Sequence, residues 1–207
     1  PRAPRMTAMV WRSRSALFGA ACLVALAACQ RRREAPVAAR APGEVPMARQ
    51  PIAIDGELHE PDWNTLARVA AFIAEGAEAR PYSQIRLLRD AETLYVGLYA
   101  ADQDIRSTDA FELAIGAMAL SIDARGRITP PVAGARAAAD VDETIDDPRD
   151  EDEEWVLEVA IPIAAVPPGA TAIHAARCDT PKDGVRRCGS WDGPLVLSSQ
   201  ADLHVKR

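Results

Sequence analysis

Residues 51–63, which read PIAIDGELHEPDW, decide the fold. Ile52 and Ile54 alternate with small or polar residues, and this period of two predicts a short edge strand. Asp55-Gly56 is a turn pair, because glycine tolerates a positive φ. The Glu-Pro-Asp that follows begins a short helical turn, with proline at its first position. The stretch therefore predicts a strand, a tight turn and a tryptophan, Trp63, that closes the end of a β-sandwich.

Further runs rich in β-branched and aromatic residues recur along the chain with turn signals between them. They predict strands at residues 85–90, 94–100, 111–115, 119–123, 155–162, 172–177 and 195–197. The Ala-rich residues 132–140 and the acid-rich residues 140–154 are expected to form loops. No long amphipathic helix is evident. The pattern predicts an all-β fold, an antiparallel, jelly-roll-like β-sandwich with a short N-terminal helical turn.

A basic segment and a compact apolar run precede this domain, as in a signal peptide. The run ends in Leu-Ala-Ala-Cys29, which resembles the bacterial lipobox. The resemblance implies that Cys29 is lipidated and anchors the protein to a membrane. An ordinary signal peptide with a coincidental cysteine is the alternative. We expect a lipoprotein signal peptide at 1–28, a disordered tether at 29–50 and the sandwich at 51–205. Gln30, where Asp would suggest inner-membrane retention, favours the outer membrane of the bacterial cell envelope.

Two cysteines remain in the predicted domain, Cys178 and Cys188, on either side of a polar loop. In an exported protein, such a pair is most simply a disulfide bond. Free thiols and a metal site are the alternatives, although no second cysteine pair or close histidine pair supports a metal.

The charge of the chain argues against nucleic acid as a partner. Net charge is −6, and the first 28 residues carry four arginines and no acid. Residues 29–207 therefore hold 20 basic and 30 acidic residues, a net charge of −10. Phosphate backbones require clustered Lys and Arg. Aromatic residues make up only 5% of the chain, so platforms for stacking rings are few.

Four blocks together resemble the family 9 carbohydrate-binding modules. They are the Ile-Asp-Gly-Glu-Leu stretch with its tryptophan, the Leu-Tyr-Val-Gly-Leu strand that runs to Asp102, the Asp-Ala-Phe-Glu-Leu block and the Trp-Val-Leu-Glu-Val-Ala-Ile-Pro strand. The resemblance implies a non-catalytic module that binds an oligo- or polysaccharide, in support of carbohydrate catabolism. In such modules aromatic rings sandwich the sugar and calcium supports loops. The candidate ligand-binding residues are Trp191, in a loop expected at 189–193, with Arg177, Asp192 and Tyr99; Tyr82 is a further ring.

No cofactor is required by this interpretation, and calcium is a candidate. Carboxylates are its preferred ligands, and Asp102, Asp104 and Asp109 follow the central strand closely. With Glu112, the same acids invite a glycosidase interpretation, but solubility explains exposed carboxylates equally well.

Three other functions stay open. One is a structural or interaction lipoprotein with envelope protein partners and a degenerate sugar site, which the shortage of aromatics favours. Another is a haem-binding sandwich domain, for which Met118 and His174 are the available ligands. The last is an accessory part of a glycoside hydrolase, although no catalytic domain is seen in the sequence.

Overall fold

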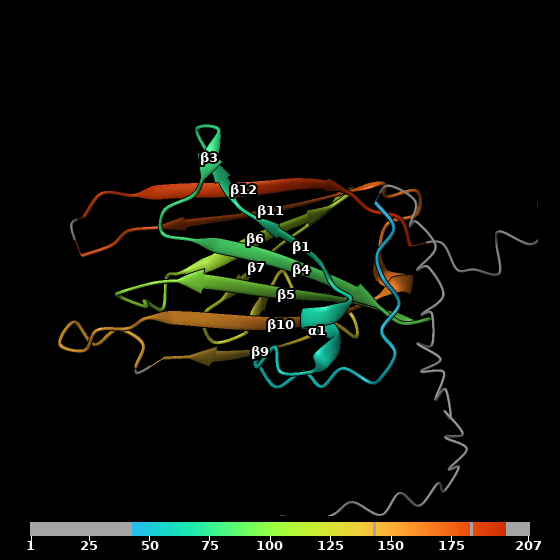
Figure 1. The fold of residues 1–207 in the computed structure, drawn as a ribbon, viewed down its shortest axis with the longest axis horizontal. Helices are drawn as coiled ribbons and strands as arrows, with labels where there is room; N and C mark the ends of the chain where they lie inside the picture. The colour runs from blue at the N-terminus through green and yellow to red at the C-terminus, as the bar shows by residue number, and fades with distance from the viewer. Residues whose placement is uncertain (1–42, 143, 183, 198–207) are drawn as a thin grey trace, which may run out of the picture. The chain divides into compact units, whose positions relative to one another are not determined.

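The computed structural model describes residues 43–142, 144–182 and 184–197 as two antiparallel β-sheets packed face to face (Figure 1). Across the first sheet lie, in order, β1 (Arg68–Ala71), β4 (Ser83–Arg89), β5 (Thr93–Ala101), β10 (Glu154–Pro162) and β9 (Arg136–Val141). Across the second lie β3 (Ala77–Glu78), β2 (Ile73–Ala74), β12 (Arg187–Pro194), β11 (Ala172–Asp179), β6 (Ala110–Ile115), β7 (Met118–Asp123) and β8 (Ile128–Thr129). Helical turns are α1 (Pro61–Thr65) and the 3₁₀ turn η1 (Ile163–Ala165). The predicted antiparallel β-sandwich with a short N-terminal helical turn is confirmed.

The main core lies between the sheets and follows the alternation of the sequence. On β10, Trp155, Leu157 and Val159 point inward and are fully buried. Leu157 stands opposite Leu98 of β5, so the two central strands of the first sheet present one continuous apolar surface. Burial of each such side chain contributes about 1.5–3 kcal/mol, and this surface holds the second sheet in place.

A second, smaller core lies on the outer face of the first sheet, beneath residues 52–66. Trp63 is fully buried there and packs with Leu88 of β4. A Cβ at Gly97 would lie 2.6 Å from Leu58, so the covering segment approaches the sheet closely. Figure 1 shows α1 in front of the central strands. The expected edge strand at 51–55 is wrong: Ile52 is buried, but this segment pairs with no strand, and it covers a face of the sandwich rather than its end.

The folded domain begins earlier than Pro51, so the predicted end of the tether at residue 50 is too late. Val45 is fully buried, and Glu44 forms a parallel bridge with Val196. The predicted signal peptide, Cys29 and residues 30–42 lie outside the described residues, as do residues 198–205. Among the described residues, no helix is both long and apolar enough to cross a membrane.

Two other sequence-based expectations differ from the structure. Residues 195–197 form no strand, and the last strand among the described residues is β12, where the sequence predicted a loop. Residues 136–141, expected in a loop, form the edge strand β9 beside β10. Short alanine side chains at this edge fit against the main core without a conspicuous apolar pattern.

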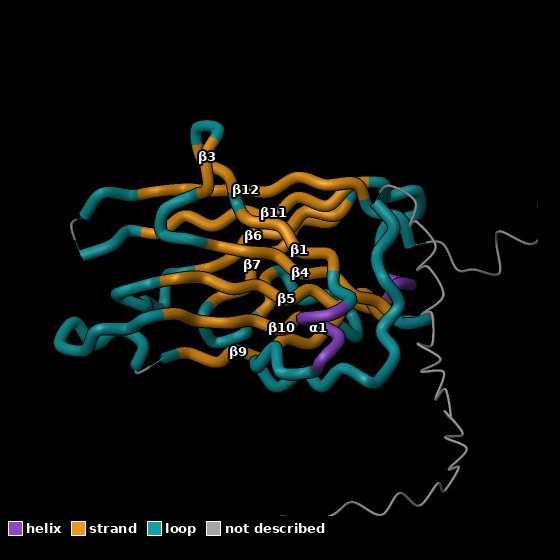
Figure 2. The backbone as a smooth tube through the Cα atoms, in the orientation of Figure 1, coloured by secondary structure: helices purple, strands orange, loops and turns teal. Residues whose placement is uncertain are grey.

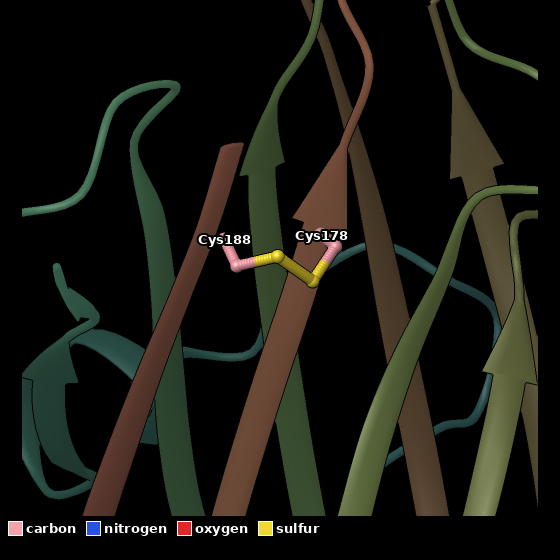
Figure 3. Close-up of a disulfide and its surroundings, with 2 residues drawn as sticks. All are labelled: Cys178 and Cys188. Atoms are coloured by element: carbon pink, nitrogen blue, oxygen red, sulfur yellow. A yellow bond between two sulfur atoms is a disulfide. The ribbon is translucent and has the colours of Figure 1, made fainter. Parts of the chain in front are cut away.

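A disulfide joins β11 to β12, as predicted (Figure 3). Cys178 and Cys188 stand directly opposite each other in the antiparallel pair. The bond closes the connection between the two strands at the end of the sandwich where β11 finishes.

Candidate functional site

Several connections meet at the end of the sandwich where β5 finishes and β4 and β10 begin (Figure 2). They surround a pocket of about 670 Å³, which we call the end pocket. Its lining residues are Arg80, Pro81, Ala101, Asp102, Gln103, Glu151, Asp152, Glu153, Pro181 and Arg187.

A cluster of buried acids adjoins the end pocket. Oxygens of Asp102, Asp109 and Asp179 lie within 4.8 Å of one another. The guanidinium of Arg177 enters the cluster, with Nη2 2.5 Å from Asp102 Oδ2 and 3.6 Å from Asp179 Oδ1. Trp155 donates from Nε1 to the same Asp102 oxygen at 3.2 Å. One guanidinium thus faces three carboxylates.

In this cluster, where carboxylates outnumber the guanidinium, the pKa values of two acids are raised. Burial raises the pKa of Asp109 to about 6 and also raises the pKa of Asp179, because a carboxylate without water is costly. Both oxygens of Asp179 lack a hydrogen-bond partner among the described residues, although Asp179 is only 3% exposed. Buried polar atoms are rarely left unpaired, so Asp179 has capacity for a cation or donor.

Of the three predicted calcium ligands, the structure brings together Asp102 and Asp109. Asp104 instead binds its neighbour Arg106, whose Nε lies 2.9 Å from Asp104 Oδ2. The sequence pattern did not point to Asp179, because the expected strand ended at residue 177. Two further residues of strict alternation would have placed its side chain on the same inward face as Arg177.

A second hollow of about 550 Å³ adjoins the end pocket, and Glu151 and Glu153 line both. We call it the acidic hollow because every ionisable residue of its lining is an acid. Those lining residues are Asp140, Val141, Asp142, Glu151, Glu153, Glu154, Trp155 and Val156.

Two tyrosines form an aromatic platform on the outer face of the first sheet, beside the hollows. The ring centroids of Tyr82 and Tyr99 are 6.0 Å apart, and both side chains are half-buried. Gln84 donates from Nε2 to the Tyr82 hydroxyl at 2.9 Å. Tyr99 stands opposite Val156, a lining residue of the acidic hollow. Burial, with a hydrogen bond to Glu154, raises the pKa of Tyr99 to about 12. The platform therefore offers neutral rings beside polar groups.

The other predicted ligand-binding residues lie elsewhere. Trp191 belongs to β12, is half-buried against the main core and has the Arg68 guanidinium 4.9 Å from its ring centroid. Asp192 points from the outer face of the second sheet and contacts His174 Nδ1 at 2.8 Å. Arg177 is 3% exposed and engaged with Asp102. Of the predicted ligand-binding residues, Tyr99 alone lies on the outer face of the first sheet.

The expected haem ligands do not converge. Met118 packs against the main core, whereas His174 is on the opposite, outer face of the second sheet. Two axial ligands must reach the same iron atom, but side chains on opposite faces of one sheet point away from each other, so these two residues do not fit the group.

Taken together, the fold is a β-sandwich with an aromatic platform and two polar hollows at one end. A carbohydrate-binding module of family 9 from Caldicellulosiruptor kristjanssonii, solved with cellotriose, is similar in structure. Its TM-score is 0.50 at 15% identity, over 72% of this chain and 83% of that one. A family 9 module from the same organism, solved with glucose, gives a TM-score of 0.47 at 16% identity, over 76% of this chain and 97% of that one. No family model matches the sequence, and no curated protein matches it. The likeness confirms the expected fold, a sandwich like that of family 9 modules.

Proposed function

We propose that this protein binds a carbohydrate on the outer face of the first sheet, at the part next to the end pocket, without a catalytic step. The observation that carries the proposal is the pair of half-buried rings, Tyr82 and Tyr99, beside the end pocket. Sugar rings present apolar C–H faces and polar edges, so they suit flat rings flanked by hydrogen-bonding groups. Gln84 and Glu154 supply such groups beside the rings.

The structural neighbours support the same class of ligand. The module with the TM-score of 0.50 was solved with a gluco-oligosaccharide, cellotriose. Because a shared fold does not imply a shared function, the proposal depends on the site itself. The expected role of Trp191 is not carried forward, because Arg68 lies over its ring and the main core packs against it.

Titration calorimetry with gluco-oligosaccharides tests this proposal. Tyr99→Ala should weaken binding about tenfold, since loss of a ring contact costs about 0.5–1.5 kcal/mol beyond the lost buried area. Tyr99→Phe, which keeps the ring, should bind nearly as well as the unchanged protein. Asp192→Ala, on the other sheet, should leave binding unchanged. Binding that survives Tyr99→Ala and Tyr82→Ala but is lost in Asp192→Ala would move the site to the second sheet.

A failure of every sugar to bind would favour the interaction-lipoprotein alternative, and envelope proteins would then be the partners to seek.

We further propose that a divalent cation, calcium in the first instance, binds at Asp102, Asp109 and Asp179. Support comes from the spacing of their oxygens and from the burial of Asp179, whose contact with Arg177 is a long ion pair of 3.6 Å. Calcium prefers several carboxylate oxygens at 2.3–2.6 Å, and the nearby Arg177 would limit its affinity by repulsion. The test is the urea midpoint with calcium or with EDTA: calcium should raise the midpoint in the unchanged protein but not in Asp179→Asn.

Lipidation of Cys29 and an outer-membrane location in the bacterial envelope complete the proposal. Metabolic labelling with a fatty acid, with Cys29→Ser as the control, tests the anchor. Incorporation of label into the Cys29→Ser variant would refute it.

A further inference from the structure

The charges around the aromatic platform are strongly asymmetric. The acidic hollow has five carboxylates and no basic residue in its lining. Arg80 and Arg187 line the end pocket but not the acidic hollow, and they come from other segments of the chain than Glu151 and Glu153. A ligand on Tyr99 therefore has a purely acidic neighbour on the β9–β10 side.

One buried acid of the end pocket has unused capacity. Asp152 is 2% exposed and accepts from the backbone N–H of Ile105 at 2.7 Å through Oδ2. Its Oδ1 is buried and has no hydrogen-bond partner among the described residues. Burial raises the pKa of Asp152, so the negative charge of this carboxylate lacks full compensation within the protein. An acceptor of this kind, in the lining of a pocket, is suited to a ligand that brings a donor or a positive charge.

The ammonium of Lys182 is not hydrogen-bonded to any described carboxylate of the acid-rich segment. Lys182 donates from Nζ to the backbone carbonyl of Asp150 at 2.7 Å. Arg149 pairs with Asp147 in the same acid-rich segment, with Nη2 2.5 Å from Oδ2. Glu151, Glu153 and Glu154 are all exposed, so their charges face the space that a ligand would enter.

On the basis of the proposed function, we propose that the saccharide recognised at this site carries a free amino group, as in oligosaccharides of unsubstituted glucosamine. The sugar ring stacks on Tyr99, and its ammonium lies beside Glu151 and Glu153, which line both the acidic hollow and the end pocket that contains Asp152. Charge-assisted hydrogen bonds are about twice as strong as neutral ones, and an ammonium beside a tyrosine face gains a further cation–π attraction. The same carboxylates repel uronic or sulfated glycans, so the acidic hollow also discriminates against acidic ligands.

Three β-1,4-linked tetrasaccharides test the inference, since they differ only at carbon 2 of each ring. Glucosamine tetramer has an ammonium there, the glucose tetramer a hydroxyl, and the N-acetylglucosamine tetramer an amide. Calorimetry on the purified protein, at low salt and with EDTA, should show the glucosamine tetramer bound at least tenfold more tightly than the other two. The advantage should fall steeply at 0.5 M salt, where charges are screened over about 4 Å.

A pair of charge-matched variants locates the effect. Glu151→Gln with Glu153→Gln should remove most of the preference for the glucosamine tetramer and leave binding of the glucose tetramer nearly unchanged. Glu112→Gln with Asp192→Asn removes two charges from the second sheet, where both residues are exposed, and should keep the preference. All four side chains are exposed, so the variants are expected to fold.

Glucose and glucosamine tetramers of equal affinity would overturn this inference and leave the proposed carbohydrate binding intact. Binding of none of the three would overturn both. Equal loss of preference in the two double variants would show general attraction to an acidic protein, and that outcome also overturns the assigned site.

Discussion

The buried Glu158 allows a prediction about pH and stability. It lies on the outer face of β10, is fully buried beneath residues 52–66 and accepts three hydrogen bonds. Trp63 donates from Nε1 to Oε1 at 2.8 Å, and the backbone N–H groups of Asp55 and Gly56 donate to Oε2 at 3.0 and 3.1 Å. Burial nevertheless outweighs these bonds and raises the pKa of Glu158 to about 7.

An acid whose pKa is higher in the folded chain binds its proton more tightly there than in the unfolded chain. Stability is therefore gained as pH falls through the folded value towards the ordinary value of 4.5. Between pH 8 and pH 5 the contribution of Glu158 to the free energy of unfolding amounts to about 2–3 kcal/mol. Glu158→Gln has a similar shape and does not titrate, so it should lack this part of the pH dependence.

Urea unfolding at pH 5, 6.5 and 8, followed by tryptophan fluorescence without reductant, measures the effect. The difference in unfolding free energy between the unchanged protein and Glu158→Gln should shift by about 2–3 kcal/mol in favour of the unchanged protein from pH 8 to pH 5. Asp109, with a pKa near 6, adds its own dependence to both proteins and cancels in the comparison. A difference that stays constant with pH, or shifts the other way, would refute the reasoning.

Two perturbations of the backbone and the crosslink give further predictions. Gly56 has φ +98, and a Cβ there would lie 2.6 Å from the carbonyl carbon of Ala139, whereas Gly76 has φ +85 and open space around it. Gly76→Ala should lose about 1–2 kcal/mol of stability, because alanine disfavours this backbone conformation. Gly56→Ala should lose at least about 1 kcal/mol more, because its Cβ is also crowded. Equal urea midpoints for the two variants would contradict this. Reduction of the Cys178–Cys188 bond, which closes a separation of 10 residues, should cost about 2–3 kcal/mol, so an unchanged melting temperature in reductant would count against it.

The strands that the sequence predicted well are those with strong apolar patterns. Residues 155–162 and 94–100 became the two central strands β10 and β5, within one residue at each end. Both are bounded by turn signals and are rich in β-branched or aromatic residues. Their burial on the inner face and partial cover on the outer face explain why they are apolar on nearly every position.

The strands that were missed have weak local signals. β9 is rich in alanine, and β12, which reads RCGSWDGP, contains two glycines and ends in proline. Glycine and proline ordinarily mark loops, but close neighbours explain them here. A Cβ at Gly189 would lie 2.4 Å from Ala79, and one at Gly193 would lie 2.1 Å from Trp191. The contact of Gly189 with Ala79 joins residues far apart in the sequence, so no short window of sequence contains it.

The candidate site was only partly predictable for the same reason. Tyr99 was predicted as a candidate ligand-binding ring, but its neighbours come from β4, β10 and the segment before β10. The acid-rich stretch at 140–154 was interpreted as a solvated loop, because the sequence does not show that its carboxylates line hollows beside Tyr99. Trp191 was favoured for its glycine neighbours, but one of them, Gly193, instead makes room for the ring of Trp191.

The bridge between Glu44 and Val196 has a consequence for how the protein is presented. Val45 donates to the Val196 carbonyl at 3.1 Å, so the first and last described residues leave the sandwich together, at the end away from the end pocket (Figure 1). The nine residues of β5 separate these two ends by about 30 Å. Attachment through either end of the described residues would therefore take place on the side of the sandwich opposite Tyr99 and the hollows, and the attachment point itself would not obstruct a ligand there.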